Sequence, residues 1–194
     1  MDFRLLGPVE VRQGMDPLSL GGPKPRTLLA HLLLELNQVV PAERLIEAVW
    51  DEQPPKAARN TLQTYVSHLR RELGPDRLEG RAGGYVLHGE GSEVDVYRFE
   101  QLLAAARAVA TDDPAGAVRT YREALAQWRG PALDDLADQP SLRAEIVRLE
   151  ELRLTAVEER LRKELELGRH AEGAIVKSCG RGSSRISGGA LLLG

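Results

Sequence analysis

Hydrophobic and polar positions alternate with two different spacings in the first 90 residues. Within residues 3–14, Val9 and Val11 alternate with Glu10 and Arg12, and a short polar turn then leads to "LSLGG", which predicts two or three short strands of a small antiparallel sheet. Residues 24–38, 39–50 and 59–73 instead repeat their apolar side chains every three or four positions, which predicts three helices. Residues 77–89 return to a strand pattern around paired glycines and predict a hairpin, with Gly83 and Gly84 at its tip able to take positive φ.

From residue 95 onward the pattern is helical only. Apolar side chains predict a helix near residues 95–110, a second helix capped by Asp113, and a long helix over residues 141–167 that ends at Gly168. Residues 177–194 are rich in Gly and Ser, and we expect a disordered or non-native tail. An antiparallel helical array that stops one helix after a long helix leaves an apolar side uncovered. We therefore expect this second part to be C-terminally truncated.

The predicted helix over residues 59–73 has an unusual polar face. Its apolar stripe consists of Leu62, Val66, Leu69 and Leu73. The rest of its surface carries amides, hydroxyls, an imidazole and arginines, namely Arg59, Asn60, Thr61, Gln63, Thr64, Ser67, His68, Arg70 and Arg71. Asn and Gln pair with adenine, Arg pairs with guanine, and the hydroxyls reach phosphates or base edges. Taken alone, the helix fits DNA reading and an ordinary solvated face about equally well.

The order of the elements favours DNA binding. Three helices followed by a Gly-tipped hairpin are typical of a winged helix-turn-helix, in which the third helix enters the major groove and the hairpin touches the DNA backbone or the minor groove. Residues 53–88 carry six basic and three acidic side chains, 6 − 3 = +3, within a chain of net charge −3. Lys24 and Arg26 open the first helix, where we expect a contact with backbone phosphate.

Composition excludes several other classes of protein. The chain of 194 residues is 42% hydrophobic and 28% charged, as soluble globular proteins are. The single cysteine, Cys179, rules out an intramolecular disulfide. No run approaches the ~18 apolar residues of a membrane span, and the first residues lack signal-peptide features. The histidines lack metal-ligand spacing, and no nucleophile–base pair is evident. We expect a cytoplasmic protein that is not an enzyme, with no cofactor, no metal and no membrane partner.

Several segments resemble a known family. Four of them are similar to the N-terminal domain of SARP-type regulators, which are actinomycete transcriptional activators with an OmpR-like winged helix: "LLGPVEV", "PKPRTLLAHLLLELNQVVPAERLIEAVW", "RNTLQTYVSHLRRELG" and "GGYVL". The following part, from "DVYRFEQLL" to "LELGRHAE", resembles the bacterial transcriptional activator domain, a tetratricopeptide-like helical array. The resemblance covers residues 1–173. The expected fold is mainly α with a small β-sheet, with a winged helix-turn-helix at 1–94, a partial tetratricopeptide-like domain at 95–176 and a tail at 177–194.

The resemblance implies a sequence-specific transcriptional regulator, an activator located at the nucleoid. Such a protein binds direct-repeat promoter elements in double-stranded DNA as two tandem protomers, a homodimer on DNA, and recruits RNA polymerase with its sigma factor. It implies that Asn60, Thr61, Thr64, Ser67, His68 and Arg71 face the groove. It also implies that Arg81 and the "GGY" turn form the wing, anchored by Tyr85. The alternative is a helical protein-interaction module whose winged helix does not bind DNA.

Overall fold

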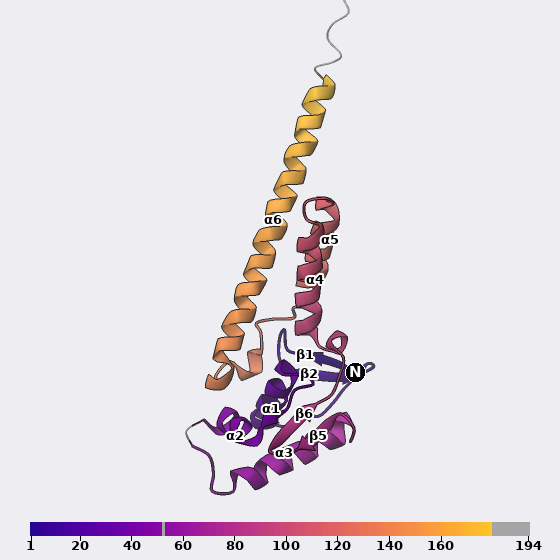
Figure 1. Ribbon diagram of the computed structural model, residues 1–194. Helices are drawn as coiled ribbons and strands as arrows, with labels where there is room; N and C mark the ends of the chain where they lie inside the picture. The colour runs from indigo at the N-terminus through magenta and orange to yellow at the C-terminus, as the bar shows by residue number, and fades with distance from the viewer. Residues whose placement is uncertain (52, 180–194) are drawn as a thin grey trace, which may run out of the picture.

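The computed structural model describes residues 1–51 and 53–179 and has two parts, which we name the head and the arm (Figure 1). The head contains β1 (Asp2–Arg4), β2 (Glu10–Gln13), β3 (Asp16–Pro17), α1 (Pro23–Leu34), β4 (Val40–Pro41), α2 (Ala42–Trp50), α3 (Ala58–Leu73), β5 (Leu78–Arg81) and β6 (Gly84–Leu87). The arm contains η1 (Gly91–Glu93), α4 (Asp95–Val109), α5 (Pro114–Leu125), η2 (Asp134–Leu136), η3 (Pro140–Leu142) and α6 (Arg143–Cys179). The predicted fold class, a winged helix followed by a helical part, is confirmed.

Two small antiparallel sheets frame the head. The first has the order β1-β2-β3, with Phe3 opposite Val11, and confirms the strands predicted near the start of the chain. The second has the order β4-β6-β5, so the predicted hairpin is present. The strand β4 was not predicted, because its two residues carry no alternating pattern and are held only by pairing with β6.

The two glycines at the hairpin tip have different roles. Gly83 has a φ of +81°, as predicted, so it takes the conformation that favours glycine. Gly84, for which the sequence also allowed positive φ, does not adopt it. A side chain there is excluded instead by the close approach of β4, because a Cβ would overlap the carbonyl oxygen of Val40 and lie 2.9 Å from its carbonyl carbon.

The apolar stripe of α3 anchors this helix in the head. Leu62 and Leu69 are fully buried, and Val66 and Leu73 are 2% and 3% exposed. The last residue of α3 is Leu73, and Gly74 caps the helix with a φ of +101°. The chain leaves the helix at this glycine and continues into the hairpin. In Figure 1, α3 lies at the end of the head that points away from α4, α5 and α6.

The arm is built from three helices, of which α6 is by far the longest (Figure 1). Asp113 caps α5 as predicted, since its Oδ1 accepts a 2.8 Å hydrogen bond from the backbone N–H of Gly116. The prediction that Gly168 ends α6 is wrong, because the helix continues to Cys179. A glycine inside a helix costs only about 1 kcal/mol relative to alanine, and strong helix formers precede it. The predicted tail lies outside the described residues apart from 177–179, which belong to α6.

Backbone and side-chain contacts join the head to the arm. Phe3 of β1 forms a parallel bridge with Val94, and the backbone N–H of Leu133 donates to the carbonyl of Leu5 at 2.8 Å. The buried carboxylate of Asp95 accepts hydrogen bonds of 2.8–2.9 Å from the backbone N–H groups of Leu5 and Leu6. One continuous hydrophobic core therefore runs through both parts. Among the described residues, no helix is long and apolar enough to cross a membrane.

Candidate nucleic-acid interface

The polar face of α3 is open to solvent. Five of the residues expected to contact base edges are exposed on one side of the helix, namely Asn60, Gln63, Thr64, Ser67 and Arg71. The side chain of Arg71 is 73% exposed. Because the opposite stripe is buried in the head, α3 presents these amides, hydroxyls and a guanidinium outward on a rigid support.

Arg70 has a structural role that the sequence did not indicate. Its side chain is half-buried, and its Nε donates a 2.8 Å hydrogen bond to the backbone carbonyl of Leu78 at the start of β5. This bond fastens the hairpin to α3. The structure thus separates Arg70 from the exposed polar face, although Arg70 was expected to contact DNA.

The two threonines of α3 turn their hydroxyls toward the helix itself. The Oγ1 of Thr61 donates to the carbonyl of Ala57 at 3.2 Å, and the Oγ1 of Thr64 donates to the carbonyl of Asn60 at 3.1 Å. Thr61 is half-buried, whereas Thr64 is exposed. A threonine inside a helix often donates its hydroxyl to the carbonyl four residues earlier. The position of Thr61 and Thr64 within a predicted helix could therefore have indicated these bonds from the sequence.

Arg71 is held in place by its neighbours on α3. Its Nη2 lies 2.9 Å from Nδ1 of His68, and its Nε donates to a carboxylate oxygen of Glu72 at 3.3 Å. Arginine can only donate, so Nδ1 of His68 is the acceptor and the imidazole proton sits on Nε2. His68 is itself half-buried. It therefore supports Arg71 from the side rather than extending into solvent.

The hairpin carries one exposed cation next to an acid. Arg81 forms a 2.9 Å ion pair with Glu79, which also lies 3.0 Å from Nε2 of His88. The hydrogen bond from His88 and the neighbouring Arg81 lower the pKa of Glu79 below its usual value, although burial opposes them. Tyr85 of β6 is half-buried, with its ring beside Gly80 on β5. Arg81 thus lies in the strand pair nearest the tip of the hairpin, and Tyr85 lies in the next pair.

The cations outside the wing differ in their surroundings. Lys24 is exposed, with its Nζ 5.4 Å from the centroid of the Trp50 ring. Arg26 turns toward the arm, where its Nη1 donates to Asp135 at 2.7 Å. Arg59 is exposed and pairs with Glu43 of α2. Lys24 and Arg59 remain on the surface near α3, whereas Arg26 joins the head to the arm.

The +3 charge counted for residues 53–88 overstates the charge available to DNA. Arg77 lies within this range but donates two hydrogen bonds, of 2.5 and 2.7 Å, to the carboxylate of Glu93, outside it. The bonds from Arg77 lower the pKa of Glu93 to about 2, despite the opposing effect of burial. This ion pair links the hairpin to the arm, so the charge of Arg77 serves the fold rather than a contact with DNA.

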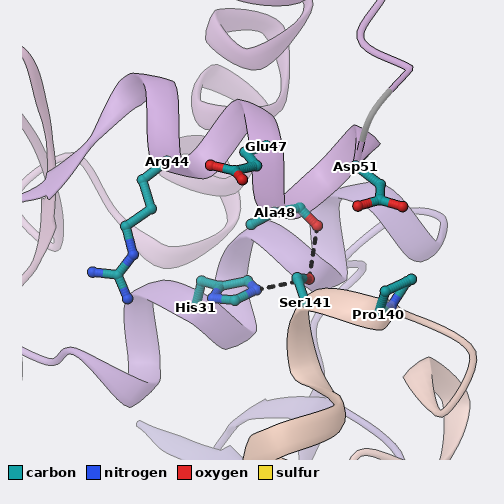
Figure 2. Close-up of a pocket in the computed structure, with 7 residues that line it drawn as sticks. All are labelled: His31, Arg44, Glu47, Ala48, Asp51, Pro140 and Ser141. Carbon is teal, nitrogen blue, oxygen red and sulfur yellow. Dashed lines mark hydrogen bonds between the residues drawn. The ribbon is translucent and has the colours of Figure 1, made fainter.

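A cavity of about 380 Å³ opens where α1 and α2 of the head meet η3 of the arm (Figure 2). His31 of α1 lies 3.1 Å from the hydroxyl of Ser141, which donates in turn to the carbonyl of Ala48 at 2.8 Å. Burial, and secondarily the positive charge of Arg44, lower the pKa of His31. The cavity lining mixes acids, a cation and small side chains without a convergent set of ligands. Within residues 1–51 and 53–168, whose side chains the structure describes, no cluster of three His, Cys, Asp or Glu side chains could hold a metal ion.

These features define a class of protein. A three-helix head with an exposed polar third helix and a β-hairpin wing, joined to a helical arm, is a winged-helix protein. The family model for "Transcriptional regulatory protein, C terminal" matches residues 17–87, and the model for "Bacterial transcriptional activator domain" matches residues 94–178.

The similar proteins are transcriptional regulators. Regulatory protein DnrI of Streptomyces peucetius is 36% identical over 183 residues, covering 88% of this chain and 67% of that protein. Regulatory protein AfsR of Streptomyces griseus is 40% identical over 171 residues, covering 88% of this chain but only 18% of that protein. The structure of Mycobacterium tuberculosis EmbR in complex with a low affinity phosphopeptide superimposes with a TM-score of 0.83 at 34% identity, covering 91% of this chain and 48% of that chain.

The chain belongs to the SARP-type family of transcriptional regulators, with an OmpR-type winged helix and a bacterial transcriptional activator domain. It spans two thirds of DnrI, about half of the EmbR chain and less than a fifth of AfsR. The expected family resemblance is therefore confirmed. By their names, the relatives are regulatory proteins.

Proposed function

We propose that this protein is a transcriptional activator that binds direct-repeat promoter elements through α3 and the hairpin wing. The observation that carries the proposal is the exposed polar face of α3, set opposite a stripe whose four residues are at most 3% exposed. A helix fixed in this way can enter the major groove as a rigid body, so little conformational entropy is lost on binding.

The proposed contacts fall into two groups. Asn60, Gln63, Thr64, Ser67 and Arg71 meet base edges, because they share the exposed face of α3. Lys24, Arg59 and Arg81 meet backbone phosphates, because they are cations on the surface around that face. Thr61 and His68 support the first group from half-buried positions. The remaining three residues have positioning roles. Arg26 positions the arm, and the hairpin wing is positioned by Arg70 and Tyr85.

We further propose a division of labour along the chain. Residues 1–94 form the DNA-binding unit, and residues 95–176 form a helical unit that contacts protein. Two protomers that touch each other on adjacent repeats would bind DNA more tightly than one protomer, because binding of the first raises the effective concentration of the second at its repeat. The bound pair would then present a surface to RNA polymerase and its sigma factor, at chromosomal DNA in the cytoplasm. Family membership supports this assignment.

DNA binding is tested by titrating the full chain against two duplexes at 50 and 200 mM salt. One duplex is obtained by selection from a random pool, and the other has the same composition in scrambled order. We expect tighter binding to the selected duplex, and weaker binding to both at the higher salt because phosphate contacts release counterions. Equal affinity for the two duplexes would contradict sequence-specific recognition.

The second candidate is a protein-interaction module whose winged helix does not bind DNA. It is favoured by four large apolar side chains on α6 that are 45–63% exposed, namely Val147, Leu154, Leu161 and Leu165. Exposed apolar side chains along one helix are typical of a protein contact. Absence of binding to every duplex at 50 mM salt would support this candidate over the activator.

A further inference from the structure

Thr64 occupies the middle of the exposed face of α3 with its only polar group already engaged. Its Oγ1 donates a 3.1 Å hydrogen bond to the carbonyl of Asn60, one helical turn earlier. A threonine hydroxyl has one proton, and this bond uses it. The hydroxyl can therefore no longer donate to a partner, and this exposed side chain offers an acceptor oxygen and the γ-methyl group.

We propose that Thr64 recognises thymine, through contact between its γ-methyl group and the C5-methyl group of the base in the major groove. The inference rests on the proposed function, because it takes α3 to be the helix that enters the groove. Among the four bases, thymine alone presents a methyl group in the major groove, and apolar contact with a threonine methyl is a known way of reading it. Thr64 thereby determines specificity without a hydrogen bond to DNA.

The position of Asn60 predicts a second base in the DNA sequence that α3 binds. Asn60 is exposed on the same face, about 6 Å along the helix axis from Thr64. Successive base pairs of duplex DNA are about 3.4 Å apart, so the two side chains contact base pairs one or two steps from each other. The amide of Asn60 pairs with adenine. The bound sequence should therefore contain an adenine within two base pairs of the thymine that Thr64 contacts.

The competing explanation is that the hydroxyl leaves Asn60 on binding and donates to a base or phosphate instead. Two substitutions separate the explanations. Thr64→Val keeps a methyl at the same place and removes the hydroxyl, whereas Thr64→Ser keeps the hydroxyl and removes the methyl. Thr155 of α6 supplies a matched control, because its Oγ1 makes the same kind of bond, 2.9 Å to the carbonyl of Glu151, on the arm.

The test uses the full chain and a duplex selected from a random pool by the wild-type protein. Each thymine is replaced in turn by deoxyuracil, which lacks only the C5-methyl group, and affinities are measured at one salt concentration. We expect one replacement to weaken wild-type binding about fourfold, the value of one buried methyl group. Thr64→Val should retain this sensitivity. Thr64→Ser should bind the thymine duplex about fourfold more weakly and lose the sensitivity, while Thr155→Ser behaves as wild type.

Other outcomes would overturn the inference in distinguishable ways. Loss of affinity in Thr64→Val with retention in Thr64→Ser would assign a hydrogen bond to the hydroxyl. A deoxyuracil effect that persists in Thr64→Ser would place the thymine contact on another side chain. Binding of the wild-type chain to no duplex would remove the proposed function itself, and with it the role of Thr64. Circular dichroism of each variant confirms that α3 is folded.

Discussion

Nη2 of Arg71 lies 2.9 Å from Nδ1 of His68 on the same face of α3. With Nε directed to Glu72, two of the three guanidinium nitrogens of Arg71 are bonded to neighbours on α3. The remaining N–H groups on Nη1 and Nη2 can still donate to the acceptors of guanine, as an arginine fork does. His68 therefore prepares Arg71 for recognition, since less side-chain freedom remains to be lost on binding.

Replacing Arg71 by alanine should weaken binding to the selected duplex by about 1–3 kcal/mol. It should also relax the preference at a single base pair, because only the base contacted by Arg71 loses its partner. Titration of wild type and variant against the duplex and its single-base substitutions measures both effects. An unchanged affinity together with an unchanged preference would remove Arg71 from the base contacts.

Replacing Arg81 by alanine should act on all sequences alike. If this wing residue contacts phosphate, the variant binds selected and scrambled duplexes more weakly by the same factor, and the slope of log K against log salt falls by about 1. Glu79→Gln should have the opposite effect, because it removes the acid 2.9 Å from Arg81. A change confined to the selected duplex would indicate a base contact instead.

Replacing Gly84 by alanine should lower the free energy of unfolding by about 1–3 kcal/mol, because the new Cβ would overlap the carbonyl of Val40 and force β4 away from β6. Gly80→Ala is the matched control. Its Cβ would meet only the ring of Tyr85, at an ordinary distance of 3.9 Å. Urea unfolding of both variants measures the difference. Equal stability of the two would show that the hairpin tolerates a side chain at residue 84.

The Arg77–Glu93 pair should make stability depend on pH in acid. The pKa of Glu93 is lowered from 4.5 to about 2 in the folded protein, so the stabilisation is complete above about pH 4.5 and is lost as the pH falls toward 2. The difference corresponds to at most about 3 kcal/mol. Glu93→Gln should lose this stability at pH 7 and flatten its decline in acid, whereas the exposed Glu158→Gln should not. A parallel acid decline in wild type and Glu93→Gln would contradict this account.

The sequence predicted those features that depend on local patterns. The stripe of Leu62, Val66, Leu69 and Leu73 has helical spacing, and all four residues are buried as expected. The cap at Asp113 and the positive φ of Gly83 likewise follow from the preferences of single residues.

The features that were missed depend on residues far apart in the chain. Strand β4 exists only through its pairing with β6, and the requirement for glycine at residue 84 arises from that same approach. The sequence count included Arg70 and Arg77 among the cations available to DNA. In the structure they are bonded to the carbonyl of Leu78 and the carboxylate of Glu93, respectively. Helical periodicity identifies which side of α3 is polar, but it does not reveal which polar atoms are already bonded.

The central claim, that the polar face of α3 reads promoter DNA, is tested most directly by selecting bound duplexes from a random pool. The selection is performed with the wild-type chain and with a variant in which Asn60, Thr64 and Arg71 are all replaced by alanine. We predict that wild type enriches one short motif repeated in the same orientation about 10 base pairs apart, one turn of the DNA helix. The variant should enrich no motif. Enrichment of the same motif by both proteins, or of none by wild type, would contradict the claim.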